Sequence, residues 1–176
     1  MARNIEIKAH IESVGALARQ VAAFADQGPI EIRQDDTFFA CAAGRLKLRA
    51  FSSTEGELIF YRRTDQQGPK ESYYLRTPTA APDLLRQTLA EAYGEVGRVK
   101  KIRTLFLLGR TRVHLDVVED LGHFLELEVV LREDESTQAG VQEAHEIMAR
   151  LGVHSSQLID RAYVDLLTAR HRDRNG

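Results

Sequence analysis

Charged and aliphatic residues alternate along several short segments of the chain. In residues 4–11, Asn4, Glu6 and Lys8 fall on one face of an extended strand, and the aliphatic residues between them fall on the other, because side chains alternate across a strand. The same pattern recurs in residues 45–49, 101–103, 114–117 and 125–129. If the aliphatic faces pack outward under helices, the charged faces point inward. A closed or nearly closed sheet would then enclose a polar, ion-binding tunnel.

Strand and turn signals predict eight strands, which cover residues 3–11, 30–39, 45–51, 57–63, 70–76, 99–108, 112–118 and 124–131. Apolar residues at helical spacing predict four helices, which lie between Ser13 and Gly28, Thr79 and Gly94, Val141 and Gly152, and Ser155 and Ala169.

The order of these elements indicates the fold class. Because the helices fall between groups of strands and do not follow every strand, a parallel doubly wound sheet is disfavoured. The pattern predicts an α+β fold, an antiparallel eight-strand closed or nearly closed β-barrel with peripheral helices. Residues 1–169 are expected to form a single domain, and residues 170–176 a frayed C-terminal tail.

Composition limits the setting in which the chain works. Its 176 residues are 43% hydrophobic and 28% charged, which is ordinary for a globular protein, and no apolar run approaches the length of a membrane span. The start of the chain lacks the apolar core of a signal peptide. The single cysteine, Cys41, rules out an internal disulfide and fits a reducing compartment. We therefore expect a cytoplasmic protein with no membrane contact.

Charge is segregated along the chain although the net charge is only −2, which argues against a general nucleic-acid binder. Residues 45–103 contain 12 Lys/Arg and 7 Asp/Glu, whereas residues 116–165 contain 12 Asp/Glu and 3 Lys/Arg. A basic half folded beside an acidic half suits a polyanion held with divalent cations. Solvated helices are the alternative explanation for part of the acidic half.

The familiar motifs for nucleotide, zinc and serine chemistry are absent: the chain has no Walker loop, dinucleotide-binding glycine pattern, Cys-x-x-Cys pair or Gly-x-Ser-x-Gly elbow. What remains is charged residues on strands. The basic set is Lys8, Arg45, Lys47, Arg49, Arg62, Arg63, Lys101 and Arg103, and the acidic set is Glu6, Asp116, Glu126 and Glu128. Arg and Lys neutralise phosphate oxygens, and carboxylates are the ligands that Mg²⁺ or Mn²⁺ prefers. Together they can bind a triphosphate with metal ions.

These residues carry a resemblance to a known family. The Asn-Ile-Glu-Ile-Lys sequence of residues 4–8 resembles the Glu-x-Glu-x-Lys signature of the CYTH family, the triphosphate tunnel enzymes that include class IV adenylate cyclases and thiamine triphosphatases. The match continues in order through residues 34–39, 44–49, 58–63, 101–103, 114–116, 121–128 and 163–167. The amino-acid sequences of these motifs are most similar to those of bacterial class IV adenylate cyclase-like proteins.

The resemblance implies roles for individual residues. It implies phosphate contacts from Lys8, Lys47, Arg49, Arg63, Lys101 and Arg103. It implies Mg²⁺ or Mn²⁺ as cofactor, with Glu6, Asp116, Glu126 and Glu128 as metal ligands. The catalytic set would be Glu6, Lys8, Arg103 and Glu126. Asn4 stands where the family signature has its first Glu, which removes one negative metal ligand.

The implied function is metal-dependent processing of a nucleoside triphosphate or inorganic triphosphate, most closely that of a class IV adenylate cyclase, which converts ATP to cyclic AMP and pyrophosphate. A tripolyphosphatase, or a nucleoside or thiamine triphosphatase, could use the same tunnel. A third hypothesis is a non-catalytic module that binds nucleotide or polyphosphate. Homodimerisation follows from the resemblance alone.

Four residues keep a second interpretation. Asp116 could be a structural carboxylate instead of a metal ligand. His114 shares the face of Asp116 and could touch substrate, or could be satisfied beside a carboxylate. Arg62 and Arg63 point to opposite faces of a regular strand, so at most one enters the tunnel. The family match selects Arg63, which leaves Arg62 on the surface.

Overall fold

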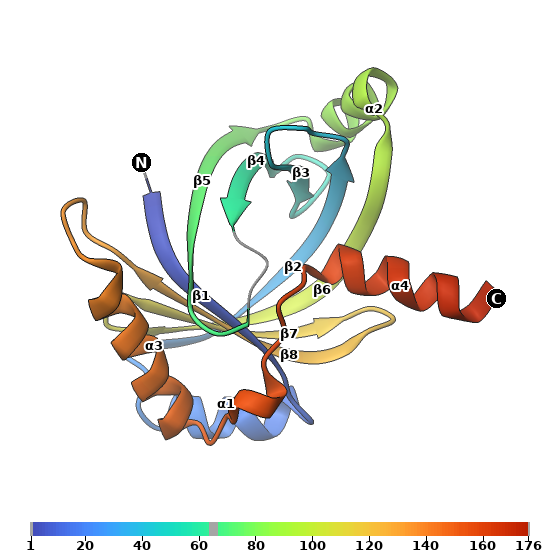
Figure 1. Cartoon of the computed structure of the whole chain (residues 1–176). Helices are drawn as coiled ribbons and strands as arrows, with labels where there is room; N and C mark the ends of the chain where they lie inside the picture. Colours follow the sequence, from blue (N-terminus) through green and yellow to red (C-terminus); the bar gives the residue numbers. More distant parts are fainter. Residues whose placement is uncertain (1, 64–66, 176) are drawn as a thin grey trace.

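Eight antiparallel strands close into a barrel in the computed structural model, which describes residues 2–63 and 67–175 (Figure 1). The strands are β1 (Ala2–His10), β2 (Gln27–Phe39), β3 (Arg45–Ala50), β4 (Gly56–Arg63), β5 (Lys70–Thr79), β6 (Glu95–Leu108), β7 (Thr111–Val118) and β8 (Gly122–Val130). Their order around the barrel is β1-β5-β4-β3-β2-β6-β7-β8, and β1 pairs with both β5 and β8. The predicted antiparallel eight-strand α+β barrel is confirmed.

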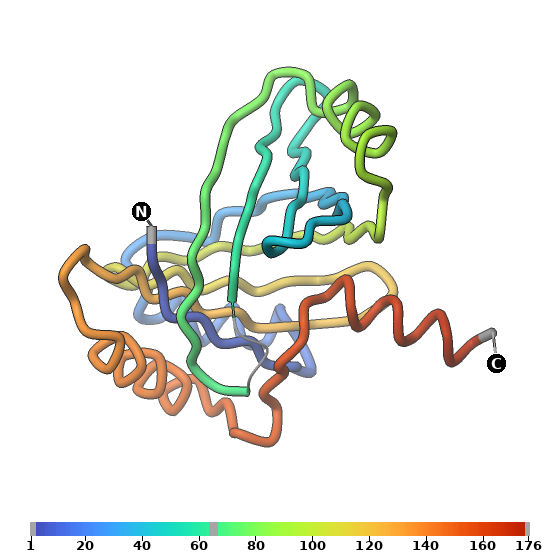
Figure 2. The backbone as a smooth tube through the Cα atoms, turned by 45° about the horizontal axis from the view of Figure 1, so that its top comes forward, coloured from blue at the N-terminus to red at the C-terminus, as the bar shows by residue number. Residues whose placement is uncertain are grey.

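Four helices lie outside the barrel: α1 (Val14–Ala22), α2 (Pro82–Tyr93), α3 (Thr137–Arg150) and α4 (Tyr163–Asn175). Helix α3 packs on β1 and β8, and α1 packs mainly on β7, so these two helices cover one side of the barrel. Helix α2 packs on β2 and β3, while α4 contacts β6 and then extends away from the barrel (Figure 2). None of the helices in the described ranges is long and apolar enough to cross a membrane.

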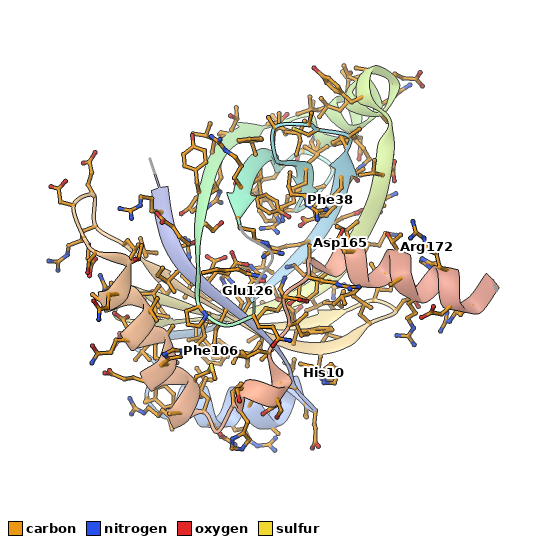
Figure 3. The ribbon with its side chains drawn as sticks, in the orientation of Figure 1. His10, Phe38, Phe106, Glu126, Asp165 and Arg172 are labelled. Carbon is orange, nitrogen blue, oxygen red and sulfur yellow. The ribbon has the colours of Figure 1, made fainter. Side chains whose placement is uncertain are left out.

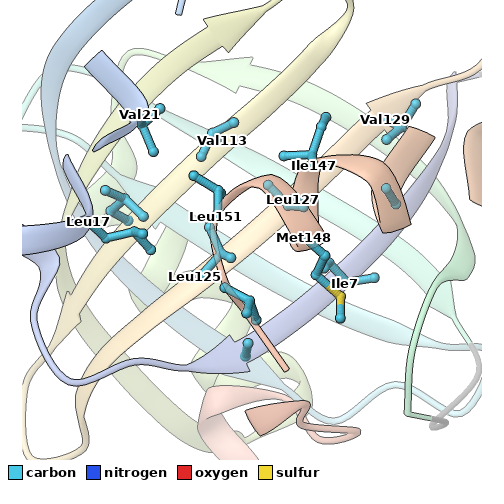
Figure 4. Packing of buried hydrophobic residues seen from close by; sticks show 14 of the residues in the cluster. Ile7, Leu17, Val21, Val113, Leu125, Leu127, Val129, Ile147, Met148 and Leu151 are labelled. Atoms are coloured by element: carbon cyan, nitrogen blue, oxygen red, sulfur yellow. The ribbon is translucent and has the colours of Figure 1, made fainter. Parts of the chain in front are cut away.

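The main hydrophobic core lies between the outer face of the barrel and the helices (Figure 4). Ile5 and Ile7 from β1 and Leu125 and Leu127 from β8 are almost completely buried there, and Met148 of α3 packs with them. Because these aliphatic residues alternate with the charged ones, burying them on the outside turns the charged faces inward. The inside-out arrangement expected from the alternating pattern is therefore confirmed.

The last helix was predicted wrongly. It begins at Tyr163 and not at Ser155, after a short 3-10 turn at Ser155–Gln157 and an extended segment. The backbone of that segment is used by β1: Leu158 forms a β-bridge with Ala9, and the Ile159 amide donates to the Lys8 carbonyl at 2.9 Å. Pairing with a strand excludes helical hydrogen bonding there. At its other end α4 continues through the residues expected to form a tail.

Strands β2 and β6 both begin earlier than predicted, at Gln27 and Glu95. The Gly28-Pro29 step, taken as a break before the strand, lies inside β2. Gly28 has φ 110°, and a Cβ atom there would lie 2.6 Å from the Leu105 carbonyl oxygen, so only glycine fits this close approach of β2 to β6.

Candidate functional site

The barrel encloses a cavity of about 260 Å³, here called the chamber. Figure 3 shows Glu126 and Phe38 within the ring of strands, whereas Phe106 belongs to the outer core. Among the described residues, eight cationic side chains line the chamber: Lys8, Lys47, Arg49, Arg63, Arg76, Lys101, Arg103 and Arg112. Five carboxylates line it as well: Glu6, Asp36, Glu57, Glu126 and Glu128. Every predicted site residue except Asp116 is therefore brought to one cavity.

Strand register explains why the charges meet. Lys8 lies directly opposite Glu126 across the β1–β8 ladder, and Glu6 lies opposite Glu128. The Lys8 ammonium and the Glu126 carboxylate are 3.7 Å apart. A second contact joins Glu6 to the Arg63 guanidinium, which reaches it from β4. Arg63 lines the chamber and Arg62 is exposed, so the two point to opposite faces as alternation requires, and the inward one is the residue that the family match selected.

Asp116 shares the inward face of β7 with His114, but it does not line the cavity itself and instead holds neighbouring cations in place. It is 0% exposed and accepts hydrogen bonds from Arg103 Nε at 2.7 Å and Nη2 at 2.8 Å, and from Lys101 Nζ at 3.1 Å. The Tyr163 hydroxyl donates to it at 3.0 Å. Burial alone would raise the pKa of Asp116, but the charges of Arg103 and Lys101 lower it well below its usual range. With its oxygens occupied in this way, Asp116 has the geometry of a structural carboxylate.

Asp36 of β2 plays the same part for two cations of the neighbouring strand β3, and sequence reasoning missed it. Its carboxylate accepts from Lys47 Nζ at 2.8 Å and from Arg49 Nε and Nη2 at 2.7 and 2.8 Å. Burial would raise the pKa of Asp36, but the two cations lower it far below its usual value. The signal was present, because Asp36 lies within the family motif of residues 34–39 and shares an alternating face with Gln34.

The chamber also holds a cluster of groups that suits a cation. One ligand atom each from His114, Glu126 and Glu128 lies within 4.8 Å of the other two. His114 Nδ1 is buried without a hydrogen-bond partner, and it is 3.8 Å from an oxygen of each glutamate, too far for a hydrogen bond. Two carboxylates and a neutral imidazole fit a divalent ion such as Mn²⁺. Asp116 is not part of this cluster.

Two further β1 residues extend the acidic side of the chamber. Burial and the nearby charge of Glu126 raise the pKa of Glu6, which indicates crowded carboxylates that a cation would relieve. Asn4, which is 2% exposed, has a side-chain oxygen without a hydrogen-bond partner. An amide oxygen is a neutral ligand for hard cations. Both residues offer oxygen atoms that suit a divalent ion, although Glu6 is not part of the His114-Glu126-Glu128 cluster.

Tyr163 closes one end of the chamber. Its ring lies 4.1 Å from Lys8 Nζ and 4.9 Å from Lys101 Nζ, and its side chain is buried. The chain just before it is tied down by Lys70, whose ammonium donates to the Asp160 carbonyl at 3.1 Å. Sequence reasoning gave Tyr163 no role because the helix was expected to start earlier and its register was unknown.

Additional ion pairs of the wall were not predicted. Arg76 binds Glu57 through two hydrogen bonds, and Arg112 binds Glu128. Arg112 shares the inward face of His114 and Asp116, so alternation could have identified it. None of the family motifs includes Arg112, so the resemblance implied no role for it.

Comparison with known proteins supports the fold. The chain matches the structure of PH1012 protein from Pyrococcus horikoshii OT3 with a TM-score of 0.81 and 21% identity, over 93% of this chain and 98% of that one. It matches an adenylate cyclase candidate from Vibrio parahaemolyticus with a TM-score of 0.72 and 17% identity, over 94% and 97% of the chains. It matches HpAC1 from Hippeastrum, an adenylyl cyclase candidate with a dominant triphosphatase activity, with a TM-score of 0.66 and 14% identity, over 97% and 96%.

No functionally curated protein matches the chain. The family model described as the CYTH domain matches residues 2–163, which include all eight strands and the tyrosine that closes the chamber. The chain therefore belongs to the CYTH family.

Proposed function

We propose that the chamber binds a nucleoside triphosphate together with Mg²⁺ or Mn²⁺ and catalyses phosphoryl chemistry on it, as in class IV adenylate cyclase-like enzymes. The observation that carries this proposal is the convergence of eight cations and a His-Glu-Glu cluster in one enclosed cavity. Burying so many like charges is costly unless an anion neutralises them. A triphosphate supplies that neutralisation along the length of the chamber.

Four of the cations form two groups, one on β6 and one on β3, and only β2 lies between these strands. Arg103 and Lys101 are positioned by Asp116, while Arg49 and Lys47 are positioned by Asp36. Fixing a guanidinium in advance reduces the entropy lost when it binds phosphate. Lys8 and Arg63 complete the phosphate contacts from β1 and β4.

The metal would be held by Glu126, Glu128 and His114, with Glu6 and Asn4 beside them. A bound divalent ion supplies positive charge to the phosphate oxygens. The chain's own contribution is to keep its carboxylates and the imidazole close together in a buried site. His114 was left open by the sequence, and its orphaned Nδ1 favours a ligand role.

In the cyclase reaction, the 3′-oxygen of the ribose attacks the α-phosphorus. The bond from that phosphorus to the α,β-bridging oxygen breaks, pyrophosphate leaves, and the hydroxyl proton passes to solvent. Lys8 and Arg103 would bind the oxygens on which negative charge develops. Positioning and charge neutralisation supply most of the catalysis.

A phosphohydrolase is the nearest rival, because it needs the same contacts with phosphate and differs only in which oxygen attacks which phosphorus. The structurally similar protein from Hippeastrum has a dominant triphosphatase activity, which supports the phosphohydrolase as an alternative. Incubation with ATP and Mn²⁺ distinguishes the two. Cyclic AMP and pyrophosphate support the cyclase, and ADP and phosphate support the hydrolase. Turnover of neither ATP nor tripolyphosphate would contradict both.

A non-catalytic binding module is the third candidate, motivated by Asn4 in the position of a signature glutamate. It predicts that ATP and tripolyphosphate bind without any product. Asn4→Glu would then restore turnover by returning the missing negative ligand. Turnover by the natural protein rules this candidate out.

Glu126→Gln is expected to raise the Mn²⁺ concentration needed for half-maximal activity by about tenfold or more, because a charged ligand becomes neutral. Binding of tripolyphosphate without metal should persist or strengthen, since a negative charge leaves the chamber. Activity is measured across a Mn²⁺ titration and binding by calorimetry in EDTA. Glu31→Gln, at an exposed side chain of β2, is the control. An unchanged Mn²⁺ dependence would exclude Glu126 as a ligand.

Triphosphate binding at pH 8 is expected to take up protons. Burial lowers the pKa of Lys8 to about 8 and that of Lys47 to about 7, with neighbouring arginines adding to both effects. Both amines are then partly or largely neutral at pH 8, and a bound anion favours their charged forms. Uptake should fall toward pH 6, where both are already protonated. Calorimetry in two buffers of different ionisation heat measures it.

Lys47→Met should remove part of this proton uptake and leave the share due to Lys8. Lys47 also makes the stability of the ligand-free protein depend on pH. Because the folded pKa of Lys47 lies below its unfolded value of 10.5, the unfolded state binds more protons between these values. The ligand-free protein should therefore gain stability from this group as pH rises from about 7 toward 10. Proton uptake unchanged by Lys47→Met would mean that Lys47 does not face the anion.

A further inference from the structure

Gln34 is a buried amide on the chamber wall that has no role in the proposed phosphate or metal contacts. It lies on β2 between Ile32 and Asp36, on the inward face, and directly opposite Lys101 of β6. Its side chain is 6% exposed, and its Oε1 has no hydrogen-bond partner among the described residues. A buried carbonyl oxygen that lacks a donor is energetically unfavourable, so the presence of glutamine at this position calls for an explanation.

The nearest cations do not satisfy this oxygen. Lys101 donates to Asp116, and Arg49 makes a two-pronged contact with Asp36. Both side chains are thus turned toward carboxylates. No described residue donates to Oε1 of Gln34, so its donor can come from a bound ligand or from water.

The oxygens of an inorganic triphosphate cannot fill that role, because they accept hydrogen bonds. A hydroxyl or amino group can donate one. Such groups occur on the sugar and the base of a nucleoside triphosphate, and they are absent from tripolyphosphate. The orphaned oxygen therefore distinguishes between the two substrate classes left open by the charges alone.

The position of Gln34 along the wall agrees with this assignment. On β2 the inward side chains pass from buried Phe38 and Asp36 to Gln34, then to half-buried Ile32, and Ile30 beyond it is 44% exposed. The chamber thus opens toward Ile32, and its lining there is mixed, because Arg103 lies directly opposite Ile32 while Leu105 lies opposite His114. Gln34 lies between the deeply buried Asp36 and this more open end.

The size of the chamber points the same way. About 260 Å³ is below the roughly 300–1,000 Å³ of pockets that enclose a drug-sized molecule. A triphosphate held among the cations would leave its organic group at the open end. That group would pass Gln34.

We propose that Gln34 is a specificity-determining residue that accepts a hydrogen bond from a hydroxyl or amino group on the organic part of the triphosphate. The proposal rests on the proposed function and adds to it that the physiological ligand is an organic triphosphate. Gln34 contributes to selectivity and not to the phosphate contacts.

The test compares ATP and inorganic tripolyphosphate by calorimetry in EDTA, so that no turnover occurs. Gln34→Met keeps the length of the side chain and removes its carbonyl oxygen. We expect it to weaken ATP binding about tenfold and tripolyphosphate binding less than twofold. Gln87→Met, at an exposed position of α2, should change neither affinity. Gln34→Leu serves as a second variant of the same kind.

Three outcomes overturn the proposal. Equal weakening of both ligands would place Gln34 among the phosphate contacts, and no weakening of either would mean that water satisfies the amide. If the natural protein binds neither ligand, the proposed function itself fails, which is a distinguishable result. A fall in the ligand-free unfolding temperature of both variants would show that Oε1 is paired within the protein, since removing an orphaned acceptor should preserve or raise it.

The donor group can be identified with ATP analogues. 2′-Deoxy-ATP and 3′-deoxy-ATP each lack one hydroxyl donor, and purine riboside triphosphate lacks the amino donor of the base. The analogue that lacks the relevant donor should bind the natural protein and Gln34→Met equally well, as expected when two partners of one contact are removed together. If every analogue keeps the full tenfold difference, the donor is none of these groups and the proposal is wrong.

Discussion

Asp116→Asn is expected to lower the free energy of unfolding by about 3–5 kcal/mol in the absence of metal and ligand. The carboxylate is completely buried and holds the guanidinium of Arg103 and the ammonium of Lys101. Asparagine keeps the shape but not the charge, so two buried cations lose their main compensation. It also presents an amide group to donors that need an acceptor, including the Tyr163 hydroxyl.

Urea unfolding in EDTA measures this effect. Asp35→Asn is the matched control, since Asp35 also binds an arginine, Arg98, but at a partly exposed site on the outside of the barrel. That change should cost about 1 kcal/mol or less. A metal ligand would behave differently, because neutralising it relieves repulsion among carboxylates in the metal-free protein. Unchanged or higher stability of Asp116→Asn would therefore contradict the structural role.

Arg103→Met is expected to weaken tripolyphosphate binding at least about 100-fold, which corresponds to roughly 3 kcal/mol. Arg103 is buried in the wall of the chamber between Asp116 and Glu126. Its loss removes a charge-assisted contact with the phosphate. It also exposes the anion to two carboxylates that have each lost one of their cationic partners.

Calorimetry with the folded variant measures the affinity, and circular dichroism confirms the fold. Arg103→Lys keeps the charge without the two-pronged geometry and should recover part of the affinity. Arg33→Met, at an exposed side chain on the outer face of β2, should bind as the natural protein does. Affinity of Arg103→Met within threefold of the natural value would remove Arg103 from the phosphate site.

Alternation along single strands was enough to predict the inside-out barrel. Whether Lys8 shares a face with Glu6 depends only on the two-residue repeat of the strand, which the sequence contains. The same parity placed Arg62 and Arg63 on opposite faces, and the family match selected Arg63 as the inward one. The family motifs, which follow one another in the expected order along the chain, then indicated that the charged strands belong to one site.

The partners of each charge could not be predicted, because they depend on register between strands that are distant in sequence. Asp116 meets Arg103 only because β6 and β7 pair in a particular register, and that register decides that its oxygens are occupied by cations. Tyr163 was missed for a similar reason. The segment before it pairs with β1, which delays the start of α4 and brings the ring over Lys8.

Calorimetric competition tests most directly whether the chamber is a triphosphate site. Tripolyphosphate is titrated into the natural protein in EDTA, alone and in the presence of saturating ATP. We predict one site per chain for tripolyphosphate and its loss when ATP is present, because both ligands need the same cations. Absence of binding, or undiminished tripolyphosphate binding beside saturating ATP, would contradict the assignment.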